Sequence, residues 1–270
     1  MASDDPLAGA DPSDASTFLP AATALLTQWG LQVGEQLHGL AEVEFYSHAP
    51  GHEDPFTHQH PGQRTQSSWY FHQEGKSFRG GTFKGLDLTF GPANVPTGIL
   101  IRTLRKPDGS LVNGSSNCVE HLLTTTGHPT VAALHGALGG RTILEPGGPL
   151  QLVRLPKPLD RPVIATARVG LTLARAARYP AMTLYFGQPY RFLTEPTIRK
   201  GKPQTILALH RQGHETASLP RVVSSTKPAV QRAIDAFERG RNGDLTSFIG
   251  QRIATTAWPE VYGAWVAASD

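Results

Sequence analysis

The chain has 270 residues, with 25 lysines and arginines against 22 aspartates and glutamates, so its formal net charge is only +3. This length allows one large domain, or one domain with an extension. The small positive charge permits nucleic-acid binding without requiring it. The single cysteine, Cys118, excludes an internal disulfide and a cysteine-rich zinc site. Because the sequence has no long apolar run and no signal-peptide pattern, we expect no membrane association.

The first elements follow from composition and spacing. Residues 1–16 are rich in Asp, Ala, Ser and Pro, which predicts a disordered leader. Residues 17–29 predict a short helix, because a proline lies in the first turn and Gly30 follows the last apolar residue.

Residues 40–48 predict a strand whose apolar residues alternate with Glu42, Glu44 and Tyr46. Since side chains alternate between the two faces of a strand, the two carboxylates and the phenol share one face. Alternation alone is typical of an amphipathic strand with a solvated face. It also fits a site in which one glutamate acts as a general base.

A long loop at residues 49–75 is dense in Pro, Gly, Gln and His, and loops of this length are usually functional or disordered. Strands are predicted next at residues 76–83, 85–90 and 98–104. The last contains Arg102 among apolar residues. Such an arginine requires a carboxylate or a ligand beside it, unless it lies at a strand edge and reaches solvent.

The remaining elements alternate between helical and strand patterns and predict an α+β fold. Helices are expected at residues 117–125 and 129–138. Strands are expected at residues 142–144, 150–155, 162–169, 181–186 and 190–193. After residue 196 a polar linker leads to helices at residues 228–239 and 245–267, the first with a core-facing apolar stripe.

Several common site chemistries do not fit. The histidines crowded between His48 and His72 match no zinc-binding spacing, so we expect no metal ion. The glycines at residues 80–85 lack the Gly-Lys-Ser/Thr ending of a phosphate loop, and no Gly-x-Ser-x-Gly motif of a serine hydrolase is present. A face with carboxylates, an arginine, aromatic rings and a histidine-rich loop suits water activation beside a planar base.

The order of these segments resembles the alkyladenine (3-methyladenine) DNA glycosylase family of the eukaryotic and Bacillus type. The resemblance rests on Glu-Val-Glu-Phe-Tyr at residues 42–46, Glu-Asp-Pro-Phe-Thr-His at 53–58 and Arg-Thr at 64–65. It continues with Leu-Ile-Arg-Thr-Leu at 100–104 and Ala-Arg-Val-Gly at 167–170.

This resemblance implies an α+β fold with a curved, mainly antiparallel β-sheet, surrounding helices and a protruding β-hairpin. We expect a glycosylase-like domain at residues 17–196. Residues 197–270 lie outside the resemblance, and we expect them to form a linker and a helical C-terminal extension packed on the same domain.

The resemblance also implies roles for individual residues. Glu44 matches the general base that activates water to attack the anomeric carbon of a flipped-out nucleotide, and Arg102 matches the arginine near that water. Tyr46 matches the ring that stacks on the flipped base, and His58 matches the residue on its other side. Phe83, or a neighbour in the hairpin, matches the wedge that intercalates into the duplex.

Two positions of the expected pocket depart from the family pattern. Phe56 stands where the family has small residues before the histidine, which implies a narrower or differently shaped pocket. Thr89 stands where the family has an asparagine that gates the pocket.

The implied function is a monofunctional DNA glycosylase of base-excision repair, a hydrolase that flips an alkylated or deaminated purine out of double-stranded DNA and releases it. We expect a monomer without a cofactor, in the cytoplasm with the nucleoid if the source is bacterial, or in the nucleus if it is eukaryotic. Two alternatives stay open. One is a non-catalytic binder of distorted or damaged DNA, and the other is the same fold acting on another modified base, RNA or a nucleoside.

Overall fold

The computed structural model describes residues 5–269, which divide into two compact units. The first contains residues 5–53, Thr57–Val163 and Phe192–Thr194; the second contains Asp54–Phe56, Ile164–Arg191 and 195–269. Residues 164–191, which the sequence led us to place in the domain at 17–196, thus belong to the second unit. The predicted α+β class, with a mainly antiparallel sheet and surrounding helices, is confirmed.

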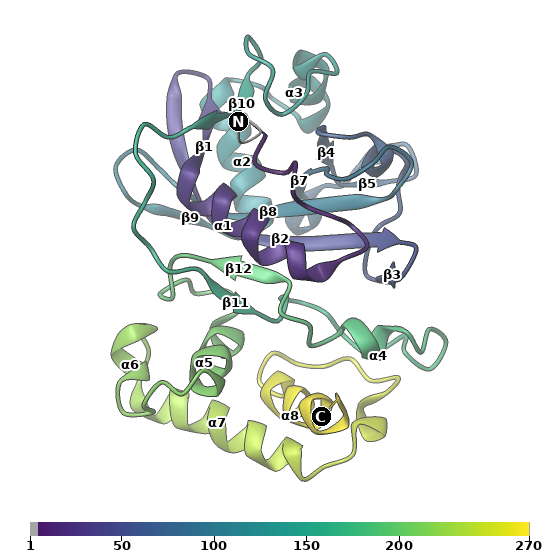
Figure 1. Cartoon of the computed structure of the whole chain (residues 1–270), viewed down its shortest axis with the longest axis vertical. Helices are drawn as coiled ribbons and strands as arrows, with labels where there is room; N and C mark the ends of the chain where they lie inside the picture. The colour runs from purple at the N-terminus through teal and green to yellow at the C-terminus, as the bar shows by residue number, and fades with distance from the viewer. Residues whose placement is uncertain (1–4, 270) are drawn as a thin grey trace. The chain divides into compact units, whose positions relative to one another are not determined.

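An antiparallel sheet organises the first unit, with its strands in the order β10, β1, β2, β8, β7, β4 (Figure 1). Short strands β3 and β9 pair with β2 and β8. The strands are β1 Trp29–Val33, β2 Gln36–Ala49, β3 His52–Glu53, β4 Trp69–Phe71, β7 Leu86–Leu88, β8 Thr97–Arg105, β9 Leu111–Asn113 and β10 Leu150–Arg154.

Helix α1 (Phe18–Gln28) covers the apolar face of β2. The ring of Phe18 stacks on Phe45 with centroids 5.0 Å apart, and Phe192 meets Phe45 edge-on at 5.5 Å. The alternation of residues 40–48 therefore puts its odd-numbered apolar side chains into the core, as the sequence predicted.

Helices α2 (Ser115–Thr126) and α3 (Val131–Leu138) lie where helical spacing predicted them. Each is followed by a glycine with positive φ, 71° at Gly127 and 59° at Gly139. Since a left-handed conformation favours glycine, these positions end the helices. Helix α2 packs against β8 and β9.

The expected strand at residues 76–83 is only partly present. Strands β5 (Gln73–Glu74) and β6 (Ser77–Phe78) form a short two-stranded ribbon, and a 3-10 turn (η3, Gly81–Phe83) follows. The strand stops because Gly80 and Gly81 offer no side chains to pack and Gly81 has a positive φ of 56°.

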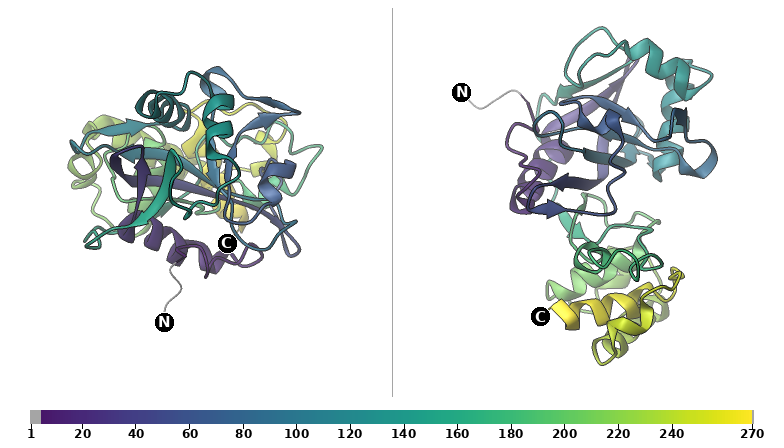
Figure 2. Two further views of the ribbon diagram at one scale, coloured as in Figure 1. Left: turned by 90° about the horizontal axis from the view of Figure 1, so that it is seen from above. Right: turned by 90° about the vertical axis from the view of Figure 1, so that its right-hand side faces the viewer.

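Most of the second unit is helical. Its elements are β11 Ile164–Thr166, α4 Met182–Tyr185, α5 Lys202–Arg211, α6 Leu219–Val222, α7 Lys227–Arg241, η4 Leu245–Phe248 and α8 Trp258–Ser269. Strand β12 (Arg191–Leu193) contributes its first residue to this unit and the other two to the first. Figure 2 shows α7 and α8 side by side. Among residues 5–269, no helix combines the length and apolar character needed to cross a membrane.

Two buried arginines hold segments of the second unit together. Arg168 Nη1 lies 2.5 Å from Asp54 Oδ2, and both side chains are fully buried. Arg191 Nη1 donates hydrogen bonds to Thr166 Oγ1 at 3.1 Å and to Thr205 Oγ1 at 3.3 Å. Since a buried guanidinium needs partners, each arginine fixes the chain segments that supply them.

Three expectations for the later chain are wrong. The strand expected at residues 181–186 is replaced by helix α4 at Met182–Tyr185, because the buried Met182 and Phe186 have helical spacing. The linker expected after residue 196 contains α5 and α6. The long helix expected at residues 245–267 is divided, and its second part begins only at Trp258.

The expected disordered leader also differs from the structure. Residues 5–14 form turns, Leu7 and Ala10 are buried, and the carbonyl of Pro12 accepts a hydrogen bond from Ser47 Oγ at 2.6 Å. Aspartate side chains accept hydrogen bonds within these turns, so the polar composition stabilises local structure here. Residues 1–4 lie outside the described part of the chain.

The close approach of α7 and α8 makes two glycines sensitive to substitution. A Cβ at Gly240 would lie 1.9 Å from the carbonyl oxygen of Glu260, and a Cβ at Gly263 would lie 2.1 Å from that of Phe237. We predict that Gly240→Ala or Gly263→Ala destabilises the protein by about 1–3 kcal/mol or more, measured by urea denaturation.

Gly136 provides the control, because it is also helical but a Cβ added there would have nothing within 4 Å. Gly136→Ala should stabilise the protein by about 0.5–1 kcal/mol. Equal effects at all three glycines would contradict the packing argument.

Candidate active site

Three charged side chains lie together within the sheet, on β2 and β8. Glu42 and Glu44 are 0% exposed and Arg102 is 7% exposed. Arg102 Nε lies 3.1 Å from Glu42 Oε1 and 3.2 Å from Glu44 Oε1, and Nη1 donates to Glu44 Oε2 at 3.4 Å. The arginine therefore bridges two buried carboxylates.

An irregularity in strand pairing makes this bridge possible. The register of β2 and β8 shifts on both sides of Glu42, so Glu42 pairs with Thr103. In a regular strand Arg102 and Thr103 would face opposite sides. Here both side chains contact Glu42. Arg102 Nε donates to Glu42 Oε1 at 3.1 Å, and the hydroxyl of Thr103 donates to Glu42 Oε2 at 2.5 Å. A β-bulge of this kind redirects a side chain toward a site.

Tyr46 completes the surroundings of Glu44. Its hydroxyl donates a hydrogen bond to Glu44 Oε2 at 2.8 Å, and its ring is half-buried. The sequence resemblance assigned Tyr46 to stacking on a base. In the structure the hydroxyl of Tyr46 also helps to hold the Glu44 carboxylate in place. It donates to Oε2, the same oxygen that accepts a hydrogen bond from Arg102 Nη1.

The electrostatics of this cluster keep Arg102 charged. Burial by itself would lower the pKa of Arg102, but the carboxylates of Glu44 and then Glu42 outweigh it and raise that pKa, so Arg102 stays a cation. Two carboxylates around one guanidinium give the cluster an excess of acidic groups within the sheet. Burying such a cluster costs stability, and clusters of this kind are commonly retained for function.

A second polar centre lies on the same face of the sheet, at Asp87 of β7. Asp87 pairs with Leu100, and Leu100 pairs with Glu44. Residues directly opposite each other share a face. Asp87 and Glu44 therefore face the same way, two strands or about 10 Å apart at Cα.

Gly98 brings this second centre beside Tyr46. Gly98 is the register partner of Tyr46, and a Cβ at Gly98 would lie only 2.4 Å from Asp87 Oδ2. The carboxylate of Asp87 therefore occupies the space next to Tyr46 that a side chain at position 98 would fill. Glycine is required here for close approach rather than for its conformation.

The Asp87 carboxylate has two hydrogen-bonded neighbours. His72 Nε2 lies 2.8 Å from Oδ1, and Gln63 Nε2 donates to Oδ2 at 3.1 Å. Within the described residues, Gln63 Oε1 is buried and has no hydrogen-bond partner. Burial raises the pKa of the adjacent Tyr70 to about 12, so this phenol keeps its proton. The unpartnered Gln63 Oε1 is therefore a buried hydrogen-bond acceptor in this centre.

His58 lies beside this centre, with its ring edge-to-face against His72 at 4.4 Å between centroids. Its pKa is lowered to about 4, first because the surrounding protein removes part of its water shell and then because of the neighbouring His72. Near neutral pH His58 is therefore an uncharged imidazole that can donate one hydrogen bond and accept another.

Two further predicted site residues, Phe56 and Thr89, have other partners in the structure. Phe56 belongs to the second unit, where its ring centroid lies 5.5 Å from the guanidinium carbon of Arg168. Thr89 is buried, and its hydroxyl accepts from Ser68 N at 2.8 Å and donates to the carbonyl of Thr65. In the structure Thr89 anchors the loop before β4.

Phe83 is 71% exposed, at the end of the η3 turn. The residues around it are fastened to α2, because Ser116 Oγ donates to the carbonyl of Gly81 at 2.7 Å and Lys84 pairs with Glu120. The ring is therefore presented to solvent by a tethered loop.

Sequence reasoning missed Asp87, His72 and Gln63 as members of the site. A signal for Asp87 was present, because an aspartate between Leu86 and Leu88 in a short strand is unusual. Nothing in the sequence showed that His72 and Gln63 converge on it. In the described part of the chain, no group of three or more His, Cys, Asp or Glu side chains is arranged to hold a metal ion.

Comparison with known proteins adds little about chemistry. No model of a known protein family matches the chain. The chain is similar to an uncharacterized protein of Acanthamoeba polyphaga mimivirus, with 35% identity over 99 residues, which cover 31% of this chain and 46% of the viral protein. The match thus spans less than half the length of that relative.

Removing the guanidinium group of Arg102 should lower the free energy of unfolding. We predict that Arg102→Leu destabilises the protein by about 3–5 kcal/mol, because two buried carboxylates lose their shared cation. Chemical denaturation measures the loss. The triple variant Arg102→Leu/Glu42→Gln/Glu44→Gln should recover much of it, and a triple variant no more stable than Arg102→Leu would contradict this account.

The histidine pair should be visible in a titration. We predict that the ring resonance of His58 titrates near pH 4 in an NMR experiment and that His72→Asn raises this midpoint, because a neighbouring imidazole is removed. Since the pKa in the folded state is below its ordinary value of 6.5, stability is lost as the pH falls from about 6.5 to 4. A His58 midpoint that does not move in His72→Asn would contradict the coupling.

Proposed function

We propose that the protein is a DNA glycosylase that hydrolyses the N-glycosidic bond of a damaged purine in double-stranded DNA. The observation that carries this proposal is the fully buried Glu44 carboxylate, held by Arg102 and by the hydroxyl of Tyr46. The finer features that the sequence resemblance implies, a curved sheet and a hairpin that enters the duplex, belong to the same proposal.

Glu44 suits the role of general base. Arg102 contacts both of its oxygens, Tyr46 donates a hydrogen bond to one of them, and the position of Glu44 on a central strand makes it rigid. A water that attacks the anomeric carbon would pass a proton to this carboxylate as the bond from carbon to base breaks and the electron pair leaves with the base. The departing base then takes a proton from solvent or from a neighbouring donor.

The charge of the cluster suits the same reaction. Hydrolysis of a glycosidic bond builds positive charge at the anomeric carbon in the transition state. The excess of acidic groups around Arg102 stabilises that positive charge more than it stabilises the neutral substrate. Glu42, which is held by Arg102 and Thr103, supports the charge and position of Glu44.

The second polar centre suits recognition of a flipped base. Asp87 fixes the ring of His72, and His72 packs against the uncharged His58. In this proposal His58 and Tyr46 contact opposite faces of the base. The exposed ring of Phe83, on its tethered loop, fills the space left in the duplex.

Release of free base from duplexes containing hypoxanthine, ethenoadenine, 7-methylguanine or 3-methyladenine tests the proposal. We predict that Glu44→Gln lowers the single-turnover rate by about 100-fold or more, because the variant keeps the shape but cannot accept the proton. Glu53→Gln, which alters an exposed glutamate of β3, should leave the rate unchanged.

Three outcomes would each contradict a part of this proposal. Undiminished release of the damaged base by Glu44→Gln would show that Glu44 is not the general base. Tight lesion binding without release by the wild type would favour a non-catalytic DNA binder. Release from a nucleoside with little dependence on salt would favour a small substrate, since duplex binding weakens steeply with salt.

A further inference from the structure

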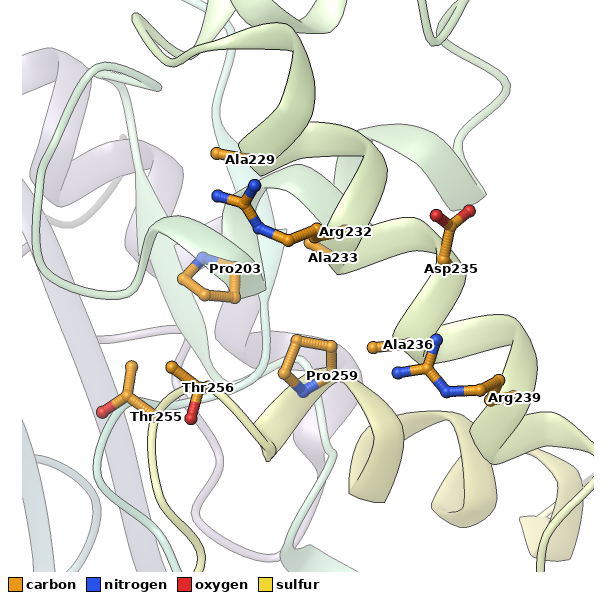
Figure 3. A pocket seen from close by; sticks show the side chains of 10 residues that line it. All are labelled: Pro203, Ala229, Arg232, Ala233, Asp235, Ala236, Arg239, Thr255, Thr256 and Pro259. Carbon is orange, nitrogen blue, oxygen red and sulfur yellow. The ribbon is translucent and has the colours of Figure 1, made fainter.

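The second unit contains a cavity of about 500 Å³ that the proposed function does not use. It lies among the start of α5, one face of α7 and the segment that leads into α8 (Figure 3). Side chains from all three segments line it. This volume is within the range of small-molecule sites.

Two arginines give the cavity its charge. Arg232 and Arg239 are seven residues apart on α7, which places them on the same helix face about 10 Å apart. Figure 3 shows both guanidinium groups on the cavity side of α7 and the carboxylate of Asp235 turned away from it. The cavity therefore presents cations.

The two cations differ in their pairing. Arg239 Nη2 lies 3.6 Å from Glu260 Oε2, and both side chains are largely exposed, so this pair is weak. Arg232 has no ion pair or hydrogen bond within residues 5–269. A ligand would therefore gain one unpaired guanidinium and compete with one exposed carboxylate.

The opposite wall supplies neutral donors and an apolar floor. The side chains of Thr255 and Thr256 line the cavity just before α8 begins at Trp258. Three alanines of α7, two prolines and Asp235 complete the lining, so two arginines stand against one aspartate there. Guanidinium groups bind phosphate through paired hydrogen bonds, hydroxyl groups add single ones, and an apolar floor fits a sugar or a base edge.

We propose that this cavity binds the phosphate group of a nucleic-acid strand or of a free nucleotide. The site is formed entirely within the second unit and lies outside the sequence resemblance. It does not depend on the chemistry assigned to Glu44, and an inactive first unit would leave it intact.

The experiment uses the full chain and two kinds of probe, a DNA duplex and small phosphate compounds. Binding of a fluorescein-labelled undamaged duplex is measured by anisotropy at several salt concentrations, and binding of inorganic pyrophosphate and of a deoxynucleoside monophosphate is measured by calorimetry. Arg232→Gln and Arg239→Gln are each compared with Arg241→Gln, which removes the same charge from an exposed position on α7 outside the cavity lining.

For a nucleic-acid phosphate, we predict that Arg232→Gln weakens duplex binding about tenfold and reduces the slope of log affinity against log salt by about 1. Arg241→Gln should change both much less. If the site instead binds a free nucleotide, the three variants have equal affinity for the duplex. Binding of the small phosphate compounds, measured by calorimetry, is then lost only in Arg232→Gln and Arg239→Gln.

Either pattern supports a phosphate site and identifies the source of the phosphate. If all three variants bind both probes alike, the proposal is overturned. Thermal unfolding followed by circular dichroism checks folding, and these exposed arginines should be replaceable without loss of stability.

Discussion

The first unit is built around the bridge from Arg102 to Glu42 and Glu44. A sheet that buries two carboxylates must supply a cation at the same depth, because an unpaired buried charge costs several kcal/mol, about 3–5. The irregular pairing of β2 and β8 supplies it by turning two successive residues, Arg102 and Thr103, toward Glu42. The ion pairs of Arg102 with the two glutamates therefore stabilise the sheet and also fix the geometry of the candidate site.

The need to pair these buried charges explains why the face around Glu44 is polar and yet ordered. Tyr46 and Arg102 meet on one carboxylate oxygen, and Asp87 comes next to Tyr46 only because Gly98 has no side chain. Each donor is fixed by a strand rather than a loop. A reacting group held by strands needs little reorganisation, which is the condition for electrostatic stabilisation of a transition state.

The two units use buried arginines differently. In the second unit Arg168 and Arg191 join chain segments through Asp54 and through threonine hydroxyls, which is a structural role. In the first unit Arg102 is shared between two acids, so acidic groups outnumber the cation. Sequence motifs that contain an arginine among apolar residues do not distinguish these cases, since the partners come from distant parts of the chain.

Local sequence patterns were sufficient to predict the helices α1, α2, α3 and α7 and the strand β2 with its two-faced pattern, because these depend on periodicity and on glycine stops. The sequence also singled out Glu44, Tyr46 and Arg102 as candidates. It could not show that the polar face is buried, that a register shift aims Arg102, or that Asp87 joins the site. Those features depend on strand pairing between residues far apart in the chain, which local patterns do not encode.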